Sequence, residues 1–220
     1  AIGFGVGINA LLSRSLGEKK QDMADKAANT GIFLSLCNFV VFALIGIFFS
    51  RTFFQLQAGG EEVIVEYGTQ YATIGLGCSS GLFTQSGFER LLQSPGRTTL
   101  AMCTQLIGAV TNIILDPILI FGLCGFPRLE VAGAAAATVA GQILAAIIAV
   151  IMNLKKNPDI HLIPREIRWN GIIAKEIYRV GFPSIVMQSI SSIMTFGMNK
   201  ILFGFTKTAT AVFGAYFKLQ

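Results

Sequence analysis

Three polar side chains recur at regular intervals in the most apolar stretch of the chain, residues 98–123 (TTLAMCTQLIGAVTNIILDPILIFGL). Gln105, Asn112 and Asp116 are spaced i, i+7 and i+11, which places them on one stripe of a helix. Asp116 is the only charged residue of this stretch, and a carboxyl group at membrane depth costs about 2.5–3.5 kcal/mol to insert. An acid in this position therefore indicates a path for an ion or a substrate.

Pro117 follows the acid directly and changes the backbone around it. Proline has no N–H, so the carbonyl of Ile113, four residues earlier, loses its helical partner. A carboxylate, the amide of Asn112 and a freed carbonyl thus gather within about one turn, a set that suits a proton or a small hard cation such as Na⁺. The alternative is structural: Pro117 serves helix packing and Asp116 pairs with a neighbouring helix.

The composition predicts an integral membrane protein, whose helices would hold the stripe of Gln105, Asn112 and Asp116. The 220 residues are 53% hydrophobic and 13% charged, whereas soluble domains carry about 25% charged residues. Residues 27–49, 67–88 and 131–154 are uncharged and long enough to span a bilayer, and residues 1–12 and 174–204 read as further membrane helices. Both ends fall in apolar stretches, so we expect the chain to be part of a longer protein.

Other polar and small side chains follow helical spacing in these segments. Gln70 and Thr73 lie in residues 67–88, which fit either a cavity lining or a tightly packed interior helix. Gly133, Ala137 and Gly141 form a small-residue ridge that favours close helix packing.

The basic residues predict the orientation, because cytoplasmic connections are enriched in Lys and Arg. If the connection after residue 12 is cytoplasmic, that side holds twelve of them: Arg14, Lys19, Lys20, Lys26, Arg90, Arg97, Lys155, Lys156, Arg165, Arg168, Lys175 and Arg179. The other side holds three: Arg51, Arg128 and Lys207. The net charge of +5 is therefore explained by topology, without a nucleic-acid partner. Asp116 then lies about 27 Å beyond Thr98 along the helix axis, in the outer half of the membrane.

The segment FERLLQSPGRTTLAMCTQLIGAVTNIILDPILIFG, followed by VAGAAAATVAGQ, resembles the multidrug and toxic compound extrusion (MATE) family. This family belongs to the superfamily that also contains the lipid-linked oligosaccharide flippases. GFPSIVMQ at 181–188 resembles the start of the family's second lobe. The resemblance implies an all-α integral membrane protein, a polytopic helical bundle that forms part of a twelve-helix, two-lobe transporter. It assigns residues 1–154 to most of the N-terminal lobe, from the end of helix 2 to helix 6. Residues 155–173 become a cytoplasmic inter-lobe linker, and residues 174–220 become helix 7 and the start of helix 8.

The resemblance also implies roles for particular residues. In the family an acid on helix 5 works with an Asn one turn earlier, a Thr on helix 6 and an acid on helix 1; Asp116, Asn112 and Thr138 match the first three. The stripe residues expected to line the cavity or contact substrate are Gln105, Gln142, Gln70, Thr73, Gln188 and Asn199, and the expected hinges are Pro117 and Pro183. The implied activity is antiport, not enzyme catalysis: organic, cationic drugs or metabolites leave by alternating access. No cofactor is expected beyond a coupling ion, H⁺ or Na⁺.

Two alternatives stay open on the sequence. A lipid-linked precursor flippase of the same superfamily would need cationic residues in the cavity, and the expected spans carry only Lys200. A membrane-embedded enzyme would need a second acid or a histidine within the spans, whereas His161 lies in a polar connection. We expect a multi-pass protein of a bacterial inner membrane, monomeric, in contact with membrane lipid and a small organic substrate, with no metal site other than possible Na⁺ binding at Asp116 and Asn112.

Overall fold

The computed structural model describes residues 2–57, 62–122, 127–160, 162, 167, 169–204, 212–214 and 216. Its main elements are all helices: α1 (Ile2–Gly17), α2 (Gln21–Gln57), α3 (Glu62–Gly77), α4 (Ser80–Gln93), α5 (Thr98–Phe121), α6 (Glu130–Lys156) and α7 (Gly171–Phe203). Three of these, α2, α5 and α6, are long and apolar enough to cross a membrane by length and composition. The expected all-helical membrane fold is confirmed.

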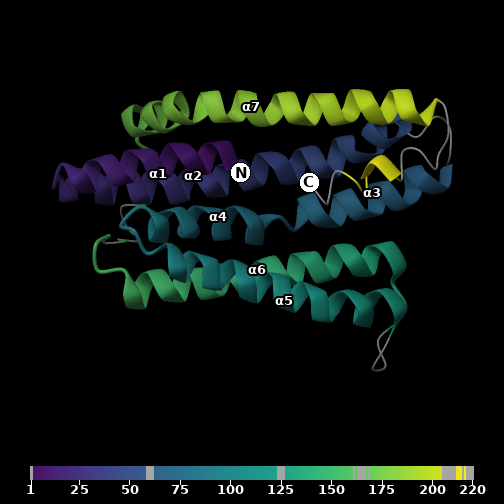
Figure 1. The fold of residues 1–220 in the computed structure, drawn as a ribbon, viewed down its shortest axis with the longest axis horizontal. Helices are drawn as coiled ribbons and strands as arrows, with labels where there is room; N and C mark the ends of the chain where they lie inside the picture. Colours follow the sequence, from purple (N-terminus) through teal and green to yellow (C-terminus); the bar gives the residue numbers. More distant parts are fainter. Residues whose placement is uncertain are drawn as a thin grey trace.

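The helices run roughly parallel to one long axis, and their ends alternate between the two ends of the molecule (Figure 1). At one end α1 passes to α2, α4 passes to α5, and α6 stops where α7 starts. At the other end α2 passes to α3 and α5 passes to α6. This alternation is the arrangement that the count of basic residues assumes, while the side of the membrane on which each end lies stays a prediction.

A cluster of buried apolar side chains joins α1, α2, α4 and α7, together with Ala149 of α6, near the end where α1 meets α2. Its fully buried members include Ile8, Leu12, Leu91 and Ile177. The α1–α2 turn at this end is fixed by Glu18, whose carboxylate accepts hydrogen bonds from Arg14 and Lys20. The Lys20 ammonium, and then the Arg14 guanidinium, lower the pKa of Glu18.

The segment 67–88, expected to form one helix, is divided in two. α3 ends at Gly77 and α4 begins at Ser80, and the two follow one another along nearly one line (Figure 1). At the break Ser79 is buried, and its hydroxyl donates to the carbonyl of Leu76 at 2.7 Å. Gly75 and Gly77 precede the break, and an added Cβ at either position would meet no atom within 4 Å.

The helices also extend beyond the uncharged stretches. α2 has 37 residues, or about 55 Å, so it reaches well past a hydrocarbon core and includes Arg51. α4 continues through Glu89 and Arg90, beyond the uncharged stretch 67–88. Which cations lie at membrane depth stays a prediction.

Close backbone contact joins α7 to α1. A Cβ on Gly181 would lie 2.6 Å from the carbonyl oxygen of Gly3, and a Cβ on Gly7 would overlap the carbonyl oxygen of Ile177. Asn170 caps the start of α7, where its side-chain oxygen accepts from the backbone N–H groups of Ile172 and Ile173. α7, which the resemblance assigns to the second lobe, thus packs directly on α1, which the resemblance assigns to the first lobe.

Candidate functional site

α5 forms despite a proline in its last turns. The segment is almost entirely apolar, and Pro117 lies inside the helix rather than at its end. The helix stops at Gly122, which adopts a left-handed conformation with φ 72° that glycine takes without steric cost. Asn112 and Asp116 therefore sit one turn apart near the end of α5 that faces the start of α6.

Glycines bring α6 unusually close to this part of α5. A Cβ on Gly141 would lie 2.8 Å from the carbonyl oxygen of Gly108 and 3.5 Å from the Cβ of Asn112. A Cβ on Gly133 would lie 2.5 Å from the carbonyl oxygen of Leu119. The expected close packing along the small-residue ridge is confirmed, and its partner is α5.

This contact joins the three residues expected at the coupling site. With its amide oxygen facing α6, Asn112 donates from Nδ2 to Asp116 Oδ2 at 3.1 Å and accepts from the backbone N–H of Thr138 at 3.2 Å, while the Thr138 hydroxyl donates to the carbonyl of Ala134 at 2.9 Å. With the amide reversed, Nδ2 donates to Asp116 Oδ1 at 3.4 Å and to Thr138 Oγ1 at 3.2 Å. In both orientations, one amide bridges a carboxylate on α5 and Thr138 on α6.

Asp116 is half-buried and forms no ion pair with any residue in the described part of the chain. Asn112 and Thr138 are half-buried as well. A carboxylate that has only a neutral amide as partner retains free lone pairs for a proton or a cation. The surrounding oxygens of Asn112 and Thr138 are of the kind that hard cations prefer. No cluster of three His, Cys, Asp or Glu side chains suited to a metal occurs among the described residues.

Asp116, Asn112 and Thr138 are called the coupling triad below. A cavity of about 420 Å³ adjoins this triad, between α2, α3, α4 and α6. Thr138 and Gln142 contribute its polar lining, while Tyr71, Phe42 and Phe83 contribute rings. The rings of Phe42 and Phe83 stack with their centroids 5.5 Å apart. Because Thr138 reaches both the cavity and Asn112, it links the acid to a space large enough for a small organic molecule.

Gln70 lies at a second cavity, of about 680 Å³, between the end of α2 and the start of α3. Its charged lining residues are Arg51, Glu62 and Glu66. Thr73, half-buried on the same helix, lines neither of these two cavities. Gln142 and Gln70 thus open onto different cavities.

The remaining expected residues lie elsewhere. Gln188 is exposed and Asn199 half-buried on α7, which also holds Pro183 within its length. Neither lines the cavity beside Thr138. Gln105, expected on the same stripe as Asn112, instead donates from Nε2 to Glu89 Oε2 at 2.9 Å.

Glu89 is the polar residue that sequence reasoning missed. It is only 5% exposed and lies on α4, where Gln85, Thr104 and Gln105 surround its carboxyl group. A signal was available: Gln85 precedes Glu89 by one turn, and the apolar run LL follows Arg90, a pattern that fits a continuing helix.

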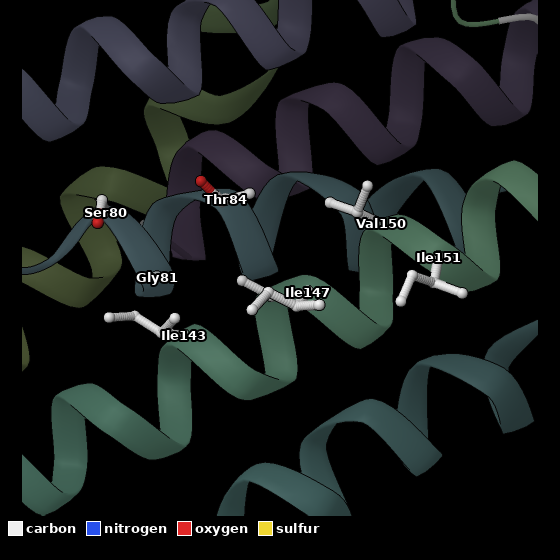
Figure 2. Close-up of a pocket in the computed structure, with 8 residues that line it drawn as sticks. Ser80, Gly81, Thr84, Ile143, Ile147, Val150 and Ile151 are labelled. Atoms are coloured by element: carbon white, nitrogen blue, oxygen red, sulfur yellow. The ribbon is translucent and has the colours of Figure 1, made fainter.

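A third cavity, of about 300 Å³, lies between α4 and α6 (Figure 2). Ile143, Ile147 and Ile151 line it from α6, opposite Gly81 and Thr84 of α4. Its lining is aliphatic apart from two hydroxyls, and it holds none of the expected site residues, so we assign it no role in ion binding.

Comparison with known proteins places the chain in a family. The MatE family model matches residues 1–118, more than half of the chain. The chain belongs to the MATE family. Multidrug export protein MepA of Staphylococcus saprophyticus is 30% identical over 218 residues, which cover 98% of this chain and 47% of MepA. The chain spans about half the length of the curated relatives it matches.

Solved MATE structures share the fold. The inward-facing conformation of a multidrug resistance MATE family transporter of the MOP superfamily is 26% identical, with a TM-score of 0.88 over 98% of this chain and 48% of that one. A MATE crystal structure in complex with MaL6 is 28% identical, with a TM-score of 0.82 over 96% of this chain and 46% of that one. The MATE family is a family of membrane transporters and not of enzymes, and the relatives from Staphylococcus and Bacillus are bacterial.

Proposed function

We propose that this chain is about half of an antiporter that exports organic cations in exchange for H⁺ or Na⁺, with the coupling ion bound at Asp116. Residues 1–154 would form most of the N-terminal lobe, residues 155–173 the linker, and residues 174–220 the start of the second lobe. One observation carries the proposal: Asn112 bridges the unpaired Asp116 to Thr138, and Thr138 lines a cavity.

The chemistry of the triad supports ion coupling. A proton on Asp116 leaves the hydrogen bond from Asn112 Nδ2 in place, because a neutral carboxyl still accepts through its carbonyl oxygen. For Na⁺, rotation of the same amide would turn Oδ1 toward the carboxylate, so that two oxygen ligands meet the ion. Either ion removes the negative charge of Asp116, and Na⁺ would in addition reorient the amide of Asn112. This loss of charge is a local event that an alternating-access transporter can use.

The shape and charge of the cavities support an organic cation as substrate. Aromatic rings of Phe42, Tyr71 and Phe83 offer flat apolar faces, and cations bind favourably over such faces. Glu62 and Glu66 at the second cavity would attract a positively charged substrate toward the end of the molecule where α2 passes to α3. The relatives named for multidrug export and the complex with MaL6 are consistent with a site for small molecules.

The experiment is gradient-driven exchange by the full-length transporter that contains this sequence, reconstituted in vesicles with a fluorescent organic cation. An imposed H⁺ gradient or Na⁺ gradient should drive dye accumulation or efflux, and a matched preparation without a gradient should not. Exchange that ignores both ions would overturn the antiport mechanism. Movement of a lipid-linked precursor in place of the dye would indicate the flippase of the same superfamily.

A further inference from the structure

The third cavity, called the α4–α6 groove below, takes no part in the sites proposed for the ion and the substrate. Its wall on α6 is a row of isoleucines at i, i+4 spacing, Ile143, Ile147 and Ile151, which are 41%, 51% and 45% exposed (Figure 2). The row extends about 12 Å along the helix axis. An aliphatic surface of this length suits a hydrocarbon chain better than it suits a polar ligand.

Two contacts between α4 and α6 bound the groove. Near one end, a Cβ on Gly81 of α4 would lie 2.8 Å from the backbone nitrogen of Ile143. Near the other end, Asn153 of α6 donates from Nδ2 to the carbonyl oxygen of Phe88 on α4 at 2.9 Å. Between these contacts a space of about 300 Å³ stays open, so the groove is a product of the packing of the two helices.

The groove lies on the side of α6 that faces away from α5. A Cβ on Gly108 of α5 would lie 3.0 Å from the Cβ of Ala145, so Ala145 faces α5. Ile147 follows two residues later, about 200° further round the helix. α7, where the assigned second lobe starts, packs on α1 and α2 and lies across the molecule from α5 and α6 (Figure 1). On α6, which is long and apolar enough to cross a membrane, an exposed aliphatic groove on this side is expected to meet lipid.

An exposed cation follows the row of isoleucines. Lys155 comes one turn after Ile151 and continues its i, i+4 spacing into the last turn of α6, and Lys156 beside it is exposed as well. Lys155 forms no ion pair with any residue that the structure describes, since Asp159, the nearest acid along the chain, pairs with Arg97 at 2.8 Å. The aliphatic stem of a lysine can follow the apolar surface while its ammonium reaches headgroup depth. A positive charge at the end of an aliphatic groove complements the phosphate of a phospholipid.

We propose that the α4–α6 groove binds an anionic phospholipid, with one acyl chain along the three isoleucines and the headgroup phosphate at Lys155. A zwitterionic lipid carries its own ammonium group, which competes with Lys155 for the phosphate, so the site favours a headgroup with net negative charge. The site is separate from the coupling triad, and it does not depend on the antiport proposed above.

Photo-crosslinking of the full-length transporter in vesicles tests the site, with a phosphatidylglycerol probe that carries a diazirine in one acyl chain. Mass spectrometry should find the label on residues 143–151. Lys155→Gln, a change at an exposed position, should lower this labelling roughly fivefold, as about 1 kcal/mol for one lysine at a phosphate implies. It should leave labelling by the matched phosphatidylcholine probe unchanged. Lys19→Gln, at an exposed lysine on the α1–α2 turn, is the control and should label like the unmodified protein.

A second variant tests the acyl chain separately. Ile147→Trp should fill the groove and reduce labelling by both probes, whereas Met102→Trp, at an exposed position on α5, should not. Absence of label from residues 143–151 would overturn the proposal, and would indicate that another part of the full-length transporter covers the groove. Equal labelling by the two probes that ignores Lys155→Gln would also overturn it. This comparison of the two probes decides the question even if Ile147→Trp does not fold.

Discussion

Gly141 sets the distance between α5 and α6, and its replacement by alanine should separate the coupling triad. The added Cβ would lie 2.8 Å from the Gly108 carbonyl oxygen, whereas ordinary van der Waals contact begins at 3.4 Å. The helices must therefore part by the difference, about 0.6 Å, if no other adjustment occurs. The same displacement would lengthen the 3.2 Å contact between Asn112 and Thr138 to about 3.8 Å, beyond hydrogen-bonding distance.

The expected cost combines two effects. Overpacking of a close contact costs about 1–3 kcal/mol, and loss of a neutral hydrogen bond costs about 0.5–1.5 kcal/mol. Gly141→Ala should thus lower the melting temperature of the full-length protein in detergent and reduce coupled exchange. Gly197→Ala is the matched control, because a Cβ at Gly197 meets no atom within 4 Å and alanine favours the helix. If the two variants have the same melting temperature and the same exchange rate, the α5–α6 contact does not position the site.

Three further predictions concern the triad, the bend and the orientation. Asn112→Ala and Thr138→Val should each weaken coupled exchange by roughly fivefold without abolishing it, as about 1 kcal/mol per hydrogen bond implies; exchange equal to the unmodified protein in both would exclude the bridge. Pro117→Ala restores a backbone N–H and should slow exchange while raising the melting temperature, and faster exchange would contradict a hinge at this position. In a variant without native cysteines, a cysteine in place of Glu62 should react with an impermeant thiol reagent from outside, and one in place of Lys155 should react only after lysis; the reverse pattern would invert the proposed topology.

The residues around the triad show how far a single sequence could lead. Asp116 stands out because an acid in an apolar helix is rare, and Asn112 follows from helical spacing. Thr138 could not be paired with them by periodicity, since the relative register of two helices depends on their connection. The resemblance supplied that pairing, and the glycines facing α5 give its physical reason: they let the backbones approach until short polar side chains meet.

Glu89 and Gln105 show where the sequence misleads. Helical spacing places Gln105 on the same face of α5 as Asn112, two turns away. The Gln105 side chain nevertheless hydrogen-bonds to Glu89 on α4 and not to the triad. The sequence does not indicate that Glu89 is buried, because it follows the uncharged stretch 67–88 and precedes a Ser-Pro-Gly turn, a combination that usually marks a helix end. Burial by α4's neighbours overrides this local signal, and no periodicity within α4 reveals which helices will cover it.

The central claim is that Asp116 binds the coupling ion, and the exchange activity of Asp116→Asn tests it most directly. The amide keeps the shape of the side chain and the contact with Asn112 but removes the charge. Reconstituted Asp116→Asn should still bind the organic cation and melt near the unmodified protein, yet show no gradient-driven exchange, while Asp22→Asn, a matched change at an exposed ion pair, should exchange normally. Exchange by Asp116→Asn at the unmodified rate under both H⁺ and Na⁺ gradients would make Asp116 a structural acid and contradict the account.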